Sequence, residues 1–367
     1  MALTYLSVPP TAQKPAGYVP GDIVDFVIAS PGLDVALNTL RLSGTLTVTG
    51  IPNATRLVFS DSAIGIHGFI NNLLVSTANQ GTISNQSAYP RWVKMRRTAS
   101  RARGDICTAA SNVAELTAGD DSKMATIFAN AGVNNPITDN AIAFSASLDI
   151  PLNNAAAADG TTPRLSYGAV GETRISLRWV APVEVFYGTD SPAASYVVTD
   201  LRLDYAALPG IAKPPPIILS TLVETKQVIN GDVAQITATL PVAASAVHST
   251  FLAVADEFST SAVNTKLARL PGISRAYLLL SDVSSQVPPL ETVEDMVEGY
   301  LQSFPEGAML GRSDCTLAKL SSGDFFGIGR ALPLPAGSSF GVQLDSSVGT
   351  LATPYYCYLF FRSSIEI

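Results

Sequence analysis

The residues of this chain that could carry chemistry are few and scattered. Its only histidines, His67 and His248, lack the HxH and HExxH spacings that are typical of zinc sites. The three cysteines, Cys107, Cys315 and Cys357, form no CxxC pair, and their odd number supports neither a disulfide framework nor a zinc site. The sequence therefore predicts no metal centre and no cofactor.

Sequence motifs of enzymes are also missing. The chain has no GxSxG turn for a nucleophilic serine, and no GxGxxG or GxxxxGK[ST] loop for phosphates. The glycine-spaced stretch Gly327-Ile328-Gly329-Arg330 is better explained by a tight turn or a bulge. A Ser-His-Asp triad or a glycosidase pair of carboxylates depends on geometry rather than on spacing, so an enzyme stays as a third alternative. We nevertheless predict that the protein is not an enzyme.

One stretch concentrates positive charge. Six of the 23 basic residues fall within 13 positions, close to Tyr89 and Trp92. They are Arg91, Lys94, Arg96, Arg97, Arg101 and Arg103. Such a cluster can face nucleic acid or an anionic membrane. Because the chain has a net charge of −7, the cluster can equally form ion pairs within the chain or between subunits. We favour the ion pairs and expect no specific recognition of nucleic acid.

The composition points to a surface that is covered by other protein. Charged residues make up 14% of the chain, against roughly 25% in an average soluble domain. No run of about 18 apolar residues is present, so we expect no membrane span. Charged residues are depleted where subunits bury their surfaces against one another. The first residues show no basic segment followed by an apolar core, so we expect no secretory signal and synthesis in a cytoplasm.

The elements that would position any site are β-strands. In residues 40–49, Leu40, Leu42, Leu46 and Val48 alternate with polar residues, which gives a strand one buried and one exposed face. Residues 174–180 and 196–205 show the same alternation. The other strands predicted before the triple proline at 214–216 are 22–29, 64–75, 89–95 and 144–152. After it they are 220–228, 233–240, 251–254, 276–280, 340–344 and 355–365.

The strands fall into two β-sandwiches. We expect an extended, proline-rich arm over residues 1–20 that is not a packed element, and a first sandwich over 21–208 with a helical insertion at about 108–142. A stiff proline-rich linker at 209–216 precedes a second sandwich over 217–367. Within it, a single apolar stripe predicts a helix at about 291–303.

The order of segments in the first half is similar to that of a known family. Residues 63–76 lead through a polar turn to Ser87-Ala88-Tyr89, and residues 144–152, 174–180 and 198–205 follow. This series resembles the first jelly roll of the viral double jelly-roll major capsid proteins, from tailless and often membrane-containing bacteriophages and DNA viruses. The likeness covers most of residues 20–208, while the second half matches by length and β content only.

The resemblance implies an all-β fold of two tandem eight-stranded jelly rolls with short helical insertions. It implies a structural protein, with three chains in a pseudo-hexagonal capsomer and many capsomers in an icosahedral virion shell. The implied partners are other copies of the chain and minor capsid or vertex proteins, with an internal viral membrane as a further candidate. Synthesis would then take place in the host cytoplasm. The family is known for jelly rolls that assemble into shells, and the low charge of this chain agrees with many subunit contacts.

A second class of function stays open besides the shell protein. A tandem β-sandwich could be a binding module, such as a lectin, an adhesin or a receptor-binding or vertex protein. Trp92, Tyr187 and Tyr300 are candidates for its exposed aromatic residues. The missing secretion signal weighs against a lectin or adhesin. Two full sandwiches of similar length favour the main shell protein over a vertex protein, which in this virus group more often has one jelly roll.

Overall fold

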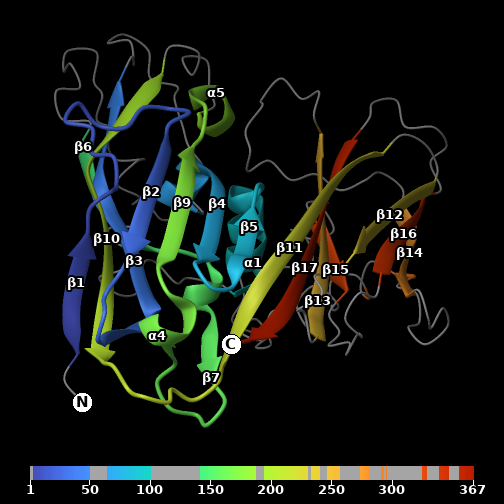
Figure 1. The fold of residues 1–367 in the computed structure, drawn as a ribbon. Coiled ribbons are helices and arrows are strands. Elements are labelled where there is room, and N and C mark those ends of the chain that lie inside the picture. The colour runs from blue at the N-terminus through green and yellow to red at the C-terminus, as the bar shows by residue number, and fades with distance from the viewer. Residues whose placement is uncertain are drawn as a thin grey trace.

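The chain forms two antiparallel β-sandwiches, which stand side by side in Figure 1. The computed structural model describes residues 3–49, 64–100, 141–186, 194–229, 233–239, 246–256, 273–280, 325–328, 339–346 and 355–367, and the single residues 291, 292 and 295.

The first sandwich consists of two sheets that enclose a common core. One sheet has the order β1 (Thr4–Val8), β10 (Ser195–Pro209), β3 (Leu33–Thr49) and β6 (Ala141–Ser147), with β8 (Arg164–Ser166) paired to β3. The other sheet has the order β2 (Ile23–Ile28), β9 (Thr173–Trp179), β4 (Ile70–Thr77) and β5 (Gly81–Gln86).

The second sandwich repeats this arrangement. One sheet has the order β11 (Ile217–Ile229), β17 (Tyr355–Glu366), β13 (Ala246–Asp256) and β15 (Phe325–Ile328), and β7 (Ala155–Ala157) joins it beside β11. The other has the order β12 (Val233–Thr239), β16 (Ser339–Ser346) and β14 (Ile273–Leu280). In both halves the first strand pairs with the last, and the second strand pairs with the last but one. The two halves therefore share one jelly-roll topology.

The alternation of apolar and polar residues determines which face of each strand is buried. Ile175, Leu177 and Trp179 of β9 lie in the core, while Arg174 and Arg178 are exposed. In β3, the predicted apolar positions of residues 40–49 are likewise buried. These strands confirm the predictions made from alternation, because a strand with one buried face needs apolar side chains at every second position.

On the exposed face of the β2–β9 pair, Asp25 accepts hydrogen bonds from Arg174 and Ser176. Burial alone would raise the pKa of Asp25, but these hydrogen bonds outweigh it and lower the pKa below its ordinary value. The carboxylate therefore stabilises the fold above its unfolded-state pKa of about 3.9, and this contribution is lost as the pH falls through the folded-state pKa.

We expect Asp25→Asn to remove this pH dependence. Urea denaturation at pH 6 should show the variant less stable than the wild type, and the difference should shrink below about pH 4. A Ser176→Ala variant, which removes one donor to the same carboxylate, should show a smaller difference with the same pH profile. An unchanged difference between the wild type and Asp25→Asn from pH 6 to pH 3 would contradict this assignment.

Short helices connect the strands of the first sandwich. They are η1 (Gly65–Phe69), α1 (Tyr89–Ser100), η2 (Pro151–Asn153), α4 (Tyr167–Val170) and α5 (Pro182–Val185). None of the helices in the described ranges is long and apolar enough to cross a bilayer.

The strand predicted at residues 89–95 is wrong, because this stretch is the start of helix α1. Tyr89, Trp92 and Val93 are buried at the spacing i, i+3, i+4, which is one face of a helix. The predicted strands at 64–75 and 144–152 are also partly wrong. The first begins with the 3-10 helix η1, and the second ends before η2, where Pro151 starts a 3-10 turn.

The expectation of an unpacked arm at residues 1–20 is also wrong in its first part. Thr4–Val8 forms β1, which pairs with β10 from Thr4↔Ala207 to Val8↔Leu203. Leu6 and Val8 pack against the core of the first sandwich. The prolines at 9 and 10 end this strand instead of preventing it, because they follow its last ladder position. The N-terminal segment is therefore the first strand of the first jelly roll.

Two predicted elements fall largely outside the described residues. The helical insertion at 108–142 is described only at its last two positions, in β6. The helix at 291–303 is described only at Glu291, Thr292 and Asp295. There, the Asp295 amide donates to Thr292 Oγ1 (3.0 Å) and the Thr292 amide donates to Asp295 Oδ2 (3.1 Å), which is a capping-box pattern. Both helices stay predictions, as does the linker at 209–216, whose residues 210–216 lie between β10 and β11 without helix or strand.

Candidate functional site

His67, the histidine whose side chain the structure describes, has a structural partner. No group of three or more His, Cys, Asp or Glu residues is placed to hold a metal ion in the described part of the chain. His67 is 1% exposed, and its Nδ1 lies 2.8 Å from Tyr89 Oη. Tyr89 Oη also accepts a hydrogen bond from the Asp149 amide (3.1 Å). His67 therefore connects η1 with α1 and with the segment after β6, which is a role in packing.

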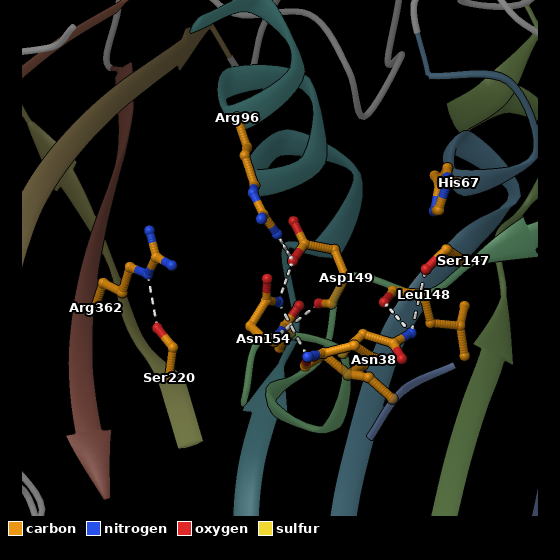
Figure 2. Close-up of polar contacts among 12 residues, drawn as sticks. Asn38, His67, Arg96, Ser147, Leu148, Asp149, Asn154, Ser220 and Arg362 are labelled. Atoms are coloured by element: carbon orange, nitrogen blue, oxygen red, sulfur yellow. Dashed lines mark hydrogen bonds and ion pairs between the residues drawn. The ribbon is translucent and has the colours of Figure 1, made fainter. Parts of the chain in front are cut away.

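The basic cluster begins on α1, and its first described members point toward the protein. The guanidinium of Arg91 lies over the ring of Tyr358, 4.4 Å from its centroid, and burial lowers the pKa of Arg91. Arg96 forms an ion pair with Asp149. Figure 2 shows the Arg96 side chain extending from α1 toward Asp149. Lys94 is half-buried. The side chains of Arg97, Arg101 and Arg103 lie outside the described residues, so a contact of the cluster with nucleic acid or a membrane stays a prediction.

Arg91 belongs to the contact between α1 and the strands β11 and β17, which we call the seam. In Figure 1, α1 and β5 lie next to β11, and the first jelly roll meets the second there. Trp92 of α1 packs on Phe360 of β17, with 5.8 Å between ring centroids. Leu222, Tyr358 and Phe360 are buried in the same hydrophobic cluster as the core of the first sandwich. The core of the first sandwich therefore extends into the seam and includes apolar side chains of β11 and β17.

Glu224 of β11 supplies a polar connection across the seam. Its Oε1 accepts hydrogen bonds from the amides of Ser87 (2.6 Å) and Ala88 (3.0 Å) and from the Ser87 hydroxyl. These groups lie at the start of α1, where backbone amides lack partners within the helix and where negative charge is favoured. Burial raises the pKa of Glu224, although these hydrogen bonds act in the opposite direction. The second jelly roll therefore caps a helix of the first.

The segment after β6, which contains η2 and β7, supplies a second connection between the two jelly rolls. β7 extends the sheet of the second jelly roll, with Ala157 opposite Ile217 and Ala155 opposite Leu219. Asn38 holds β7 in place, because its Nδ2 donates to the Ala155 carbonyl (3.0 Å) and its Oδ1 accepts from the Ala155 amide (3.1 Å). Figure 2 shows this set of contacts beside the Arg96–Asp149 pair.

Asn153 fixes the start of the same segment. Its side chain donates to the carbonyls of Leu40 and Leu148, both at 2.8 Å, and accepts from the Leu40 amide at 3.0 Å. We expect Asn153→Ala to lower the free energy of unfolding by about 1–2 kcal/mol, because these backbone groups lose their partners. Urea denaturation measures this loss. Asn79→Ala removes one hydrogen bond of an exposed amide (3.0 Å to the Ala169 carbonyl) and should cost less than half as much. Equal losses in the two variants would contradict the role of Asn153.

A cavity of about 550 Å³ lies at the base of the first jelly roll. The turn before β3, helix α4 and the start of the linker line it, with Leu33, Tyr167 and Ile211 among the lining residues. Its buried carboxylate, Asp34, accepts from the Ile211 amide (3.3 Å) and lies 3.7 Å from Arg164. The Asp34 carboxylate therefore has its hydrogen-bond and ion-pair partners within the protein.

Sequence reasoning located the basic cluster but missed the residues that meet it. Glu224 and Tyr358 were not predicted as functional, and Trp92, a candidate exposed aromatic, is buried. Ser87 and Glu224 are 137 positions apart, so no local spacing indicates their contact. The described arrangement holds two sandwiches together, and its polar groups serve that purpose.

Known proteins match this chain in structure and not in sequence. No protein-family model matches it, and no curated protein does. The structure is similar to VP54 of PBCV-1, with a TM-score of 0.58 and 12% identity, over 100% of this chain and 95% of that chain. It is similar to the STIV MCP (TM-score 0.53, 11% identity, 100% and 97% covered). It is also similar to the Faustovirus major capsid protein (TM-score 0.53, 8% identity, 100% and 90% covered). These likenesses confirm the predicted double jelly-roll fold over the whole chain.

Proposed function

We propose that this chain is a structural major capsid protein. Three copies form a pseudo-hexagonal capsomer, and capsomers assemble into the icosahedral shell of a virion. The observation that carries this proposal is the match of both jelly rolls together, over 95% of PBCV-1 VP54 and 97% of the STIV MCP. A protein that shared only a β-sandwich module would match such chains over one half.

The seam supports the same proposal. It packs apolar side chains of β11 and β17 into the core of the first jelly roll, and the two jelly rolls share one topology. Three such units place six similar jelly rolls around an axis, which is the arrangement that a hexagonal lattice needs. The low share of charged residues fits a chain whose surface is largely covered by neighbours.

The remaining predictions belong to this proposal and rest on the family resemblance. They are contacts with minor capsid or vertex proteins and with an internal viral membrane, synthesis in the host cytoplasm, and the absence of catalytic activity. The lectin or adhesin alternative loses one of its candidate aromatics, because Trp92 packs on Phe360 in the seam. Its other two candidates, Tyr187 and Tyr300, lie outside the described residues.

The solution mass of the purified chain tests the proposal. Size-exclusion chromatography with light scattering should give three times the mass of one chain, or larger shells that electron microscopy resolves as particles. A protein that stays monomeric at high concentration would overturn the proposal. Binding to a glycan array by such a monomer would favour the lectin or adhesin instead.

A further inference from the structure

The guanidinium of Arg91 has a donor that the described part of the chain does not satisfy. Arg91 lies in the first turn of α1 and is half-buried against Tyr358 of β17. Its Nε is buried and has no hydrogen-bond acceptor among the described residues. A guanidinium carries several N–H donors in one plane, and a buried donor without an acceptor costs free energy. The seam therefore contains a cation whose hydrogen bonds are incomplete.

The acids near Arg91 leave this donor unsatisfied. Glu224 and Glu184 favour the charged form of Arg91 through space and not through a hydrogen bond. Both carboxylate oxygens of Glu224 accept from backbone amides at the start of α1, Oε1 from Ser87 (2.6 Å) and Oε2 from Ala88 (3.1 Å). Burial also raises the pKa of Glu224, which favours its neutral form. The negative charge beside Arg91 is therefore smaller than that of two free carboxylates.

A second cation lies over the same tyrosine ring. The centroid of the Tyr358 ring is 4.4 Å from Arg91 Cζ and 5.6 Å from Lys226 Nζ. Lys226 and Tyr358 stand opposite each other on β11 and β17, and Tyr358 is 7% exposed and stacked on Phe360. The ring is therefore a fixed platform for both cations. Two like charges this close repel each other, and an anion that contacts both relieves the repulsion.

We propose that Arg91 and Lys226 bind a small phosphate anion, inorganic phosphate or diphosphate, beside Tyr358. The planar donors of a guanidinium suit phosphate oxygens, and the ammonium group of a lysine adds a point charge. Lys226 is exposed, so the site opens to solvent. One pair of cations fits a single anion, whereas a nucleic-acid strand or an anionic bilayer is bound by a row of positive charges.

The bound anion links the two jelly rolls. Arg91 belongs to α1 of the first, and Lys226 belongs to β11 of the second. An anion that binds the folded chain and not the unfolded chain stabilises it by mass action. The site does not depend on the proposed capsomer, because all of its residues belong to one chain.

Calorimetric titration of the full chain with sodium diphosphate, at neutral pH and constant ionic strength, tests the site. The unmodified chain should bind one diphosphate. Arg91→Met and Lys226→Met should each weaken binding by about tenfold or more, because each removes a charged donor. Lys226→Arg keeps the charge and should bind diphosphate. Arg178→Met is the matched control, because Arg178 is an exposed arginine on β9, and it should bind like the unmodified chain.

Thermal unfolding gives a second readout. Diphosphate should raise the unfolding midpoint of the unmodified chain and of Arg178→Met, and it should raise that of Lys226→Met much less. Lys226 is exposed, so its variant tests the site even when Arg91→Met does not fold. An unmodified chain that does not bind diphosphate, or an unchanged affinity in Lys226→Met, would overturn the proposal. Parallel titrations use a single-stranded oligonucleotide and phosphatidylglycerol vesicles. Binding of either that Lys226→Met abolishes, without binding of diphosphate, would overturn the assignment to a small anion.

Discussion

Replacing Phe360 with alanine is expected to lower the free energy of unfolding by about 3–5 kcal/mol. Phe360 is fully buried, and it packs on Trp92 of α1 and stacks on Tyr358 of its own strand. The substitution removes a large apolar side chain from the seam, where it packs with the core of the first jelly roll, and leaves a cavity there. Urea denaturation followed by far-ultraviolet circular dichroism measures the loss.

The position of Phe360 also predicts how the variant unfolds. Trp92 is one of the chain's two tryptophans and lies in the seam, so the midpoint of the fluorescence transition should fall together with that of the circular dichroism signal. Val183→Ala is the matched control, because Val183 is exposed on α5, and it should change stability by less than about 0.5 kcal/mol. A loss below about 1 kcal/mol for Phe360→Ala would contradict the tight packing of Phe360 in the seam.

Much of the fold could be predicted for strands that have one face in the core and the other face toward solvent. In β9 and in residues 40–49 of β3, apolar and polar residues alternate along the sequence, so these stretches followed from the local pattern. Residues 33–39 of β3 include a run of buried positions without this alternation and were not predicted as a strand. The sequence pattern of α1 was ambiguous, because Tyr89, Val93 and Met95 fit a period of two while Tyr89, Trp92 and Val93 fit a helix. The local sequence held a start signal, because Ser87 precedes the helix and Pro90 lies in its first turn, but the prediction did not use it. The carboxylate that caps the helix belongs to Glu224, far along the chain, so no local pattern indicates it.

The short strand β7 shows a second limit of local reasoning. Three alanines have no strand preference of their own. They form a strand because Asn38 holds Ala155 by both atoms of its side-chain amide, and because β11 presents an open edge to them. Both causes come from elsewhere in the chain. The contacts that join the two halves are therefore the part of the structure that sequence patterns could not predict.

Glu224 is expected to be the most important polar residue of the seam. Glu224→Ala should lower the free energy of unfolding by about 3 kcal/mol, because it leaves the amides of Ser87 and Ala88 without their acceptor and removes the charge nearest the start of α1. It also removes one of the groups, with Tyr358 and Glu184, whose negative charge favours the charged form of the Arg91 guanidinium. Urea denaturation at neutral pH measures the change.

Two further variants separate the hydrogen bonds from the charge. Glu224→Gln keeps an acceptor oxygen, so it should lose less stability than Glu224→Ala. Glu366→Ala is the control, because Glu366 is an exposed residue of β17, and it should lose less than about 0.5 kcal/mol. Burial raises the folded-state pKa of Glu224 above its unfolded value, so ionisation disfavours the folded state as the pH rises through that interval. The difference between Glu224→Gln and the wild type should therefore shift in favour of the glutamine variant as the pH rises above about 4.3. A shift in the opposite direction would mean that the hydrogen bonds to the carboxylate, rather than its burial, control its ionisation.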